Sequence, residues 1–315
     1  MDEVIRVENL SNTFGSVAAV DGLTFSVRKG EVFGIVGPDG AGKTTTMRLL
    51  TSIMDPTSGD AWVAGHHIVK ESERVKENIG YMSQRFGLYE DLSVIENIHF
   101  YGDIFSVPRK GRAEKIDRLL SFSNLTPFKK RLAGNLSGGM KQKLGLVCAL
   151  IHTPRVLFLD EPTNGVDPVS RRDFWRILGQ LLHQQVTILI STAYLDEAER
   201  CHRIGLIHKG KILASGSPKE VKTMMRGSIL QIRSSQPRQV FNCLRQKLRT
   251  GYPSLFGDRI HVAAVDCEKT LLEIKTLLKD EDLPLSGIRT VEPSLEDVFV
   301  SVLGQGRESH SHENS

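Results

Sequence analysis

The stretch GPDGAGKTT, residues 37–45, restricts the possible folds of this chain more than any other part of its sequence. It fits the pattern G-x-x-x-x-G-K-[S/T], in which glycines let backbone N–H groups point at phosphate oxygens. The apolar run EVFGIVG (31–37) precedes it and stops at glycine, as a buried strand would. Residues 43–54 follow without glycine or proline and predict a helix, whose N-terminus adds partial positive charge. The stretch therefore predicts a phosphate site between a buried strand and a helix.

Two side chains of this stretch carry specific chemistry. Lys43 supplies a cation for the β and γ phosphates of a nucleotide, and the hydroxyl of Thr44 suits Mg²⁺. A glycine-rich turn formed for structural reasons alone is the alternative, but the flanking strand and helix favour the phosphate site. The predicted nucleotide-binding residues of the loop are Gly37, Pro38, Asp39, Gly40, Ala41, Gly42, Lys43, Thr44 and Thr45.

The run RVLFLDEP (155–162) predicts a second buried strand with two carboxylates at its C-terminal end. Asp160 is predicted to hold Mg²⁺, directly or through water, and Glu161 to polarise an attacking water as general base. A strand followed by Asp-Glu would, in isolation, indicate only a solvated loop. Its position downstream of a phosphate loop is what gives the pair a chemical role.

The stretch LSGGMKQKLGL (136–146) predicts a second phosphate-binding device. Ser137, Gly138 and Gly139 precede a helical run, so a hydroxyl and several N–H groups gather at a helix N-terminus. The alternative is an ordinary helix start with Ser137 as its N-cap. Two such devices in one chain make sense if they serve different nucleotides across a dimer.

Strands and helices alternate over most of the chain, which predicts a mostly parallel sheet. After RVLFLDEP come a helix from about Ser170, the strand VTILI (186–190) and the strand RIGLIHKG (203–210). Residues 60–84 favour two short strands around a turn. From about 85 to 150, apolar residues recur at helical spacing, so a helical insertion is predicted there.

The pattern changes again near residues 221–228, which predicts a domain boundary. Beyond it, apolar strand-like and helical segments follow one another in an order that suggests a small α+β domain. The predicted organisation is one domain over 1–224, a small accessory domain over 225–304 and a disordered polar tail over 305–315.

Composition narrows the function classes. The net charge of +4 over 315 residues is too weak to indicate nucleic-acid binding. None of the four cysteines forms a C-x-x-C pair, so no zinc or redox motif is predicted. The opening MDEVIRVENL is not expected to be a signal peptide, and no apolar run reaches the roughly 18 residues that a membrane span needs. Any membrane role is therefore expected to come through a partner.

The order GPDGAGKTT, LSGGM and VLFLDEP resembles the nucleotide-binding subunit of an ATP-binding cassette (ABC) transporter over residues 1 to about 220. LSGGMKQ and the later EPSLEDVFVSVLG (292–304) resemble the drug-resistance type that powers ABC-2 exporters. The resemblance implies an α/β fold, a P-loop NTPase (RecA-like) core with a helical subdomain, beside the small C-terminal α+β domain. It also implies ATP and Mg²⁺ as cofactors, and ATP hydrolysis at sites that combine Lys43 of one cassette with Ser137–Gly139 of another.

The same resemblance implies partners and location. An ABC-2 membrane permease and a second cassette are the expected partners, without nucleic acid, at the cytoplasmic face of the inner membrane as a peripheral subunit. The segment QRFGLYEDLSVIEN (84–97) is expected to contact the permease through Phe86, Leu88 and Tyr89, with burial inside the helical subdomain as the simpler alternative.

Further residues acquire roles through the resemblance. Phe14 matches the aromatic that stacks on adenine, although it could be an ordinary half-buried ring. Gln84 matches the glutamine that reaches Mg²⁺ and the attacking water, and residues 165–167 match the loop that crosses the dimer interface. Catalysis is thus assigned to Glu161, Gln84 and Lys43, and Mg²⁺ binding to Thr44, Gln84 and Asp160.

Two positions depart from the family pattern. Asp39 stands where asparagine is usual, which adds negative charge near the phosphates. Ala193 stands where the family has a histidine that contacts the γ-phosphate, and neither His183 nor His202 is placed to compensate. The following acidic residues, Asp196, Glu197 and Glu199, are expected to cap their helix and face solvent.

These departures predict that the chain's own site hydrolyses slowly and favour a heterodimer over a homodimer. The alternatives are a non-hydrolysing ATP-binding clamp that completes a partner's site through Ser137–Gly139, and a soluble cassette ATPase that acts on ribosomes or DNA. The presence of Glu161, the predicted general base, argues against a clamp that is completely inactive. The soluble class ranks last, because its members usually carry two cassettes or a long coiled coil, whereas this chain has one cassette and no heptads.

Overall fold

The computed structural model describes residues 3–85, 87–225 and 227–308. The chain divides into two compact units, Met1–Leu213 and Ala214–Ser315. The domain boundary predicted after residue 224 lies just beyond helix α8 (Pro218–Thr223), which belongs to the second unit. Within the described ranges, no helix combines the length and apolar character required to cross a bilayer.

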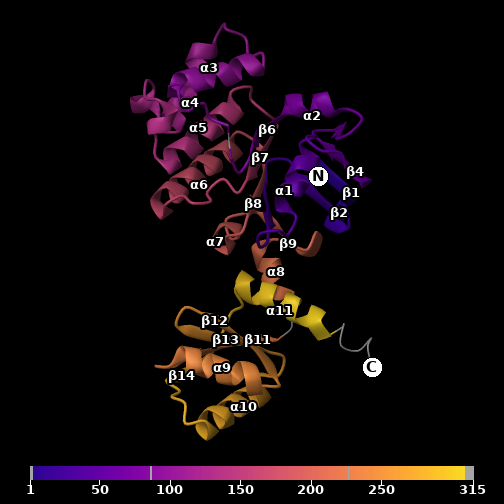
Figure 1. Ribbon diagram of the computed structural model, residues 1–315, viewed down its shortest axis with the longest axis vertical. Coiled ribbons are helices and arrows are strands. Elements are labelled where there is room, and N and C mark those ends of the chain that lie inside the picture. Colours follow the sequence, from indigo (N-terminus) through magenta and orange to yellow (C-terminus); the bar gives the residue numbers. More distant parts are fainter. Residues whose placement is uncertain (1–2, 86, 226, 309–315) are drawn as a thin grey trace. The chain divides into compact units, whose positions relative to one another are not determined.

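A parallel sheet forms the centre of the first unit (Figure 1). Its strand order is β10-β9-β3-β8-β7-β6, and the pairs β9–β3, β3–β8, β8–β7 and β7–β6 are all parallel. Every residue of β3, β7 and β8 is buried, as expected for parallel strands covered on both faces. The strands are β3 (Val32–Val36), β6 (Ile79–Met82), β7 (Val156–Asp160), β8 (Thr187–Thr192), β9 (Arg203–His208) and β10 (Lys211–Gly216).

An antiparallel sheet of order β2-β1-β4-β5 packs within the same unit. Its long strands alternate buried and exposed residues, because one face covers the core and the other meets solvent. The region 60–84 differs from the prediction of two strands around a turn, since helix α2 (Ser72–Asn78) lies inside it. The strands of this sheet are β1 (Glu3–Phe14), β2 (Val17–Arg28), β4 (Ser58–Val63) and β5 (His66–His67).

Three longer helices make up the predicted helical subdomain and lie together in Figure 1. They share a core of buried residues that includes Ile98, Leu120 and Leu144. Ser93 starts the first of them with a capping box, in which its side chain and that of Glu96 satisfy each other's backbone N–H groups. The helices are α3 (Val94–Ile104), α4 (Arg112–Phe122) and α5 (Gly138–Leu150), with the 3₁₀ turns η1 (Thr126–Phe128) and η2 (Ala133–Asn135) between α4 and α5.

Helices α1 (Lys43–Leu50), α6 (Pro168–His183) and α7 (Leu195–Ala198) complete the first unit. Each follows a strand of the parallel sheet, so its first residues lie near the C-terminal ends of the strands. In doubly wound α/β folds, ligands bind at that edge of the sheet. We therefore expect the functional residues to lie at this edge.

The second unit is an α+β arrangement built on an antiparallel sheet of order β12-β13-β11-β14. Leu230 and Ile232 of β11 face α9 and α10, while the alternate residue Gln231 faces α11 through His261 and Asp297. Helix α11 extends past residue 305, where the tail was predicted to begin, and residues 309–315 lie outside the described residues. The elements are β11 (Ser228–Arg233), α9 (Pro237–Lys247), β12 (Gly251–Phe256), β13 (Arg259–Ala264), α10 (Cys267–Asp280), β14 (Gly287–Val291) and α11 (Leu295–Glu308).

Candidate active site

The loop between β3 and α1 is held so closely that glycine is required at both ends. A Cβ atom on Gly37 would lie 2.2 Å from the carbonyl oxygen of Ile207, and one on Gly42 would lie 2.3 Å from that of Ala19. Gly42 also has φ of 105°, a left-handed conformation that side chains disfavour. The backbone of the loop is thus fixed against its neighbours, with its N–H groups at the start of α1.

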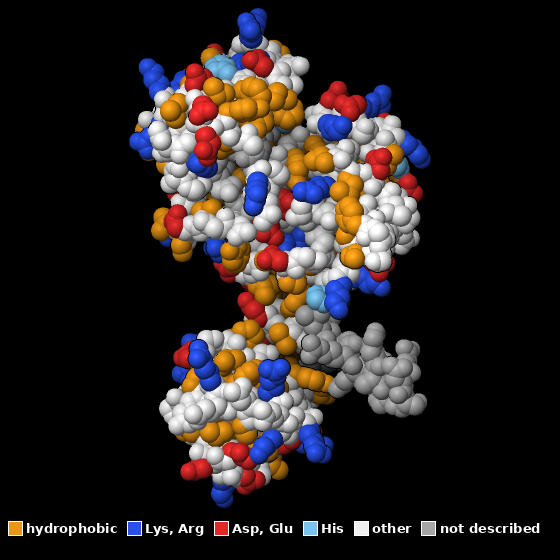
Figure 2. All heavy atoms as spheres, viewed as in Figure 1, with side chains coloured by type: hydrophobic (Ala, Val, Ile, Leu, Met, Phe, Trp, Pro, Cys, Tyr) orange, Lys and Arg blue, Asp and Glu red, His pale blue; other side chains and the backbone are white. Residues whose placement is uncertain are grey.

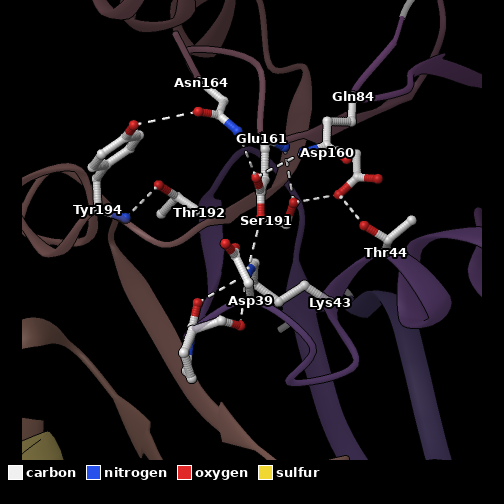
Figure 3. A network of polar contacts seen from close by, with 12 residues as sticks. Asp39, Lys43, Thr44, Gln84, Asp160, Glu161, Asn164, Ser191, Thr192 and Tyr194 are labelled. Atoms are coloured by element: carbon white, nitrogen blue, oxygen red, sulfur yellow. Dashed lines mark hydrogen bonds and ion pairs between the residues drawn. The ribbon is translucent and has the colours of Figure 1, made fainter.

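Lys43 lies at the centre of a polar network (Figure 3). Its Nζ donates to the carbonyl oxygens of Gly37 and Pro38, both at 2.9 Å, and forms an ion pair with Glu161 Oε1 at 2.9 Å. The side chain is only 3% exposed, whereas the Asp39 carboxylate, 3.9 Å from Nζ, is 94% exposed. Burial without water strengthens the Lys43–Glu161 attraction, so Glu161 is the dominant partner of this cation.

Asp160 ends β7 beside the start of α1. Its Oδ1 accepts hydrogen bonds from the Ser191 hydroxyl at 2.6 Å and the Thr44 hydroxyl at 3.2 Å. Its Oδ2 is buried and has no hydrogen-bond partner within the described ranges. Burial raises the pKa of this carboxyl, because loss of water disfavours its charged form.

A magnesium ion fits this arrangement. Mg²⁺ prefers oxygen ligands and usually combines one or two protein groups with substrate phosphates and water. The Asp160 carboxylate and the Thr44 hydroxyl supply such oxygens, and the unpartnered Oδ2 would gain its missing contact. The described residues contain no cluster of three or more His, Cys, Asp or Glu side chains suited to a metal, so phosphate and water would complete the shell.

Glu161 is held from several sides. Its backbone N–H faces Ser191, which accepts through its hydroxyl at 2.9 Å and its carbonyl at 3.2 Å. Its Oε2 accepts from Gln84 Nε2 and from Asn164 Nδ2, both at 3.2 Å. A φ of 48° places Glu161 in the left-handed region, a strain of the order of 1 kcal/mol that active sites often store. The structure therefore brings together Lys43, Gln84 and Glu161, the three predicted catalytic residues.

Three polar residues of this network escaped sequence reasoning. Ser191 bridges Asp160 and Glu161, while the Tyr194 hydroxyl donates to Asn164 Oδ1 at 3.4 Å. The only available signal was position, since each lies at the C-terminal end of a buried strand or in the loop that follows it, where α/β proteins place ligand-binding residues. Asn164 can donate to the Glu161 carboxylate only if its Nδ2 faces that group. In this orientation its Oδ1 faces the Tyr194 hydroxyl, so both contacts require the same orientation of the amide.

Ala193 is exposed between two hydrogen-bonding neighbours. The N–H of Tyr194 donates to the Thr192 hydroxyl at 2.9 Å, and the guanidinium of Arg171 lies 4.2 Å from the Tyr194 ring centre. These contacts fix the backbone around Ala193, so a side chain there would project from a defined position. Its methyl group can neither donate nor accept a hydrogen bond.

The expectation that Glu197 faces solvent is wrong. Its side chain is fully buried and accepts from the hydroxyls of Thr163 at 2.5 Å and Thr192 at 2.8 Å. Arg171 Nε lies 3.6 Å away and supplies a counter-charge. A buried carboxylate is stable only with such partners, and Asp196 and Glu199, by contrast, are exposed as expected. Glu197 thus ties the loop after β7 to the start of α7.

The second predicted phosphate device lies outside this network. Ser137 is the N-cap of α5 and accepts from the Met140 N–H at 3.4 Å. Among the described residues it makes no hydrogen bond with Lys43, Asp160 or Glu161. Ser137 and Gly138 are exposed, whereas Gly139 is buried so tightly that a Cβ would lie 2.5 Å from Ser170. Within one chain the residues form the helix cap of the alternative interpretation, while two of them remain exposed.

Phe14 ends β1 with 52% of its surface exposed, so its ring face is available for stacking.

In the predicted permease segment, Leu88 packs against the core of the helical subdomain, whereas Tyr89 is 49% exposed and contacts Phe100. Phe86 lies outside the described residues. Figure 2 shows hydrophobic side chains gathered on the helical subdomain near α3, on the face turned to the viewer.

Comparisons with known proteins agree with this geometry. A family model described as ABC transporter matches residues 20–164. The probable multidrug ABC transporter ATP-binding protein YbhF of Escherichia coli is 40% identical over 98% of this chain, which spans only 54% of that relative. The daunorubicin resistance ATP-binding protein DrrA2 of Streptomyces coeruleorubidus is 31% identical over 97% of this chain and 96% of its own length.

A solved structure shares the fold of the first unit. The ADP conformation of MJ1267, an ATP-binding cassette of an ABC transporter, superposes with a TM-score of 0.64 at 28% identity. The match covers 70% of this chain and 93% of that cassette. The predicted P-loop NTPase core with its helical subdomain is therefore confirmed as the fold of this part of the chain.

Proposed function

Because the chain belongs to the ABC transporter family, we propose that it is an ATP-binding subunit of an ABC-2 type export system. It binds ATP and hydrolyses it to ADP and phosphate within a cassette dimer, and so drives a membrane permease. The observation that carries this proposal is the convergence of Lys43, Gln84, Asp160 and Glu161 at one edge of the parallel sheet.

Nucleotide binding changes the partners of Lys43. The β and γ phosphates present more negative charge than one carboxylate, so they draw Nζ away from Glu161 Oε1. Glu161 Oε2 stays held by Gln84 and Asn164, while Oε1 becomes free to accept a proton from water. ATP binding therefore creates the general base at the moment when the phosphate is in place.

Mg²⁺, when bound, neutralises phosphate charge as the γ-phosphoryl group leaves. Asp160 and Thr44 would hold the ion. Gln84 donates to Glu161, the residue that follows Asp160, and so lies close to the proposed ion site. The Ser191 hydroxyl donates to the Asp160 carboxylate and accepts from the backbone N–H of Glu161, so it links the proposed metal ligand to the backbone that carries the proposed base.

The remaining predicted contacts come from exposed residues. Phe14 offers a ring face to adenine, and a second cassette would supply Ser137–Gly139 over the phosphates. The exposed positions of Phe14, Ser137 and Gly138 support this division of the site between two chains. The chain would act at the cytoplasmic face of the inner membrane, held there by the permease through residues 84–97.

The chain's own site is proposed to be slow, and the chain to work as half of a heterodimer. Ala193 supplies no hydrogen bond to the γ-phosphate, and Asp39 adds negative charge beside the loop. A non-hydrolysing clamp is the second candidate, and Ala193 is the observation that favours it. The orientation of Glu161 by two amide donors favours hydrolysis instead.

Glu161→Gln separates these functions. In the assembled transporter the variant keeps the shape of the side chain and its amide partners but cannot accept a proton, so ATP binding should persist while hydrolysis at this site is lost. ATP binding is measured with a fluorescent nucleotide, and single-turnover phosphate release from this site reports hydrolysis. If Glu161→Gln released phosphate as fast as the native chain, the assignment of Glu161 as general base would be wrong. A native chain that binds ATP but releases no phosphate would favour the clamp.

A further inference from the structure

A cavity of about 610 Å³ lies in the first unit, at the opposite edge of the parallel sheet from the candidate nucleotide site. Arg155 and Val186, which lie just before β7 and β8, line it, so it meets the strands where they begin. Asp160 and Thr192 end the same two strands at the other edge. The volume falls within the range of about 300–1,000 Å³ that is typical of small-molecule pockets.

Helix α4 supplies one wall of this cavity. Lys115, Arg118, Leu119 and Phe122 all line it, at a spacing of three, four and seven residues that places them on one helix face. Leu119 and Phe122 are half-buried, with part of their apolar surface open. The other apolar lining residues include Val4, Leu150, Pro154, Leu181 and Val186.

Four cations and no carboxylate line the cavity among the residues that the structure describes: Lys29, Lys115, Arg118 and Arg155. None of the four forms an ion pair with a described Asp or Glu, and Arg155 instead donates to the carbonyl oxygen of Ala64 at 3.3 Å. By comparison, Arg112 of the same helix and Lys129 each pair with an aspartate. The cavity therefore has positive charge without an internal counter-charge.

Electrostatic strain accompanies this arrangement. Burial lowers the pKa of Lys115, and the charge of Arg118 lowers it further. The pKa of His152 is lowered chiefly by burial, and the charge of Lys115 adds to that effect. Like charges in a partly apolar setting repel one another unless an anion joins them.

We propose that this cavity binds an amphiphilic organic anion, a carboxylate or phosphate attached to a hydrocarbon body. The anionic group pairs with Lys115, Arg118 and Arg155, while the hydrocarbon covers Leu119 and Phe122. The site is distinct from the ATP site and does not depend on the proposed transport function.

An adjoining cavity extends the same surface. It shares Lys29 and Arg155 with the first and adds Arg6 and Trp62, with Glu3 as its one acidic residue in the described ranges. The guanidinium of Arg6 already lies 4.1 Å from the Trp62 ring centre. A small molecule suits cavities of this size better than a protein partner, because stable protein interfaces bury about 800 Å² on each side.

The test uses the full chain and the anionic fluorophore 1-anilinonaphthalene-8-sulfonate, with saturating Mg-ATP present to block the nucleotide site. We expect saturable binding of one fluorophore, displaced by dodecanoate and dodecyl phosphate but not by uncharged dodecyl maltoside. Lys115→Glu with Arg118→Glu should weaken binding at least tenfold. The control Arg109→Glu with Lys110→Glu makes the same charge change on exposed residues outside the cavity and should have no effect.

Arg118→Ala is a second variant, chosen because Arg118 is exposed and its replacement should not disturb folding. It should weaken fluorophore binding several-fold and leave the melting temperature unchanged. Absence of saturable binding, or equal loss in the control pair, would overturn the proposal. A flotation assay with vesicles of acidic phospholipid tests whether the cavity binds a membrane surface instead of a free amphiphile. Binding to these vesicles without binding of free dodecanoate would assign the cations to a membrane surface and refute a small-molecule site.

Discussion

Lys43 is the only side-chain cation of the phosphate loop, and its side chain is buried. Nucleotide binding is therefore expected to depend strongly on it. Lys43→Ala removes charge-assisted hydrogen bonds to phosphate, which are roughly twice as strong as neutral ones. We expect ATP affinity to fall at least tenfold, measured by titration of a fluorescent ATP analogue. Lys76→Ala, on the exposed face of α2, is the matched control.

The same variant leaves Glu161 buried without its cation, so its melting temperature must be compared with that of the native chain. A folded Lys43→Ala protein with unchanged ATP affinity would show that the loop does not bind phosphates as proposed.

Asn164 gives a second prediction at this scale, since it donates to the Glu161 oxygen that stays occupied when Lys43 leaves. Asn164→Ala removes one of two amide donors, and a hydrogen bond to a charged group contributes about 1.5–3 kcal/mol. We expect kcat for ATP to fall by roughly 10- to 100-fold, with KM changed less than twofold. Asn242→Ala, exposed on α9, should change neither value. An equal rise in KM without loss of kcat would mean that Asn164 acts in binding only.

The sequence motifs predicted the charged members of the site and the family resemblance added Gln84, but the neutral residues Asn164, Ser191 and Tyr194 were not predicted. Lys43, Asp160 and Glu161 belong to motifs whose chemistry follows from residue type and position after a strand. Asn164 and Tyr194 act only through contacts between loops that follow different strands, and no spacing along one chain reveals such pairs. The prediction for Glu197 was wrong because acidic residues at the start of a helix usually face water. Only the tertiary structure shows that Thr163 and Arg171 contact Glu197 and bury it.

At the scale of elements, the segment after Gln84 connects the site to the helical subdomain. Leu88 packs inward while Tyr89 is exposed, so only part of the segment is available to a partner. Cysteines introduced at positions 85, 87 and 89 should form crosslinks to a cytoplasmic loop of the permease in the assembled complex. A cysteine at buried position 98 of α3 should not react. Failure at all three exposed positions would contradict the proposed contact.

Apolar patterns predicted the buried strands well, because parallel strands that are covered on both faces form short, nearly continuous apolar runs. The strands β3, β7 and β8 lie where 31–37, 155–162 and 186–190 indicated. Helix α2 was missed because its seven residues include one buried side chain, Val75, so it carries no helical apolar period. The end of the first domain was also placed later than the division of the chain into two compact units.

At the scale of the whole molecule, the exposed Ser137–Gly138 segment makes no hydrogen bond to the proposed nucleotide site within the described residues. Such a division of the site is useful only if two cassettes meet. If Ala193 slows the site of this chain, as proposed, while Ser137–Gly139 stays intact, a partner cassette that carries the missing histidine would contain the faster site. The proposed heterodimer follows from that asymmetry.

The most direct test of this account is the steady-state ATPase rate of the purified chain without a partner. Loss of a preorganised hydrogen bond to the reacting phosphate typically costs 10²–10³ in rate. We therefore predict little hydrolysis by the native chain and a rise of at least tenfold in Ala193→His, which Glu161→Gln in the same chain should abolish. Fast hydrolysis by the native chain, equal to that of Ala193→His, would contradict the slow site and point to a symmetric ATPase.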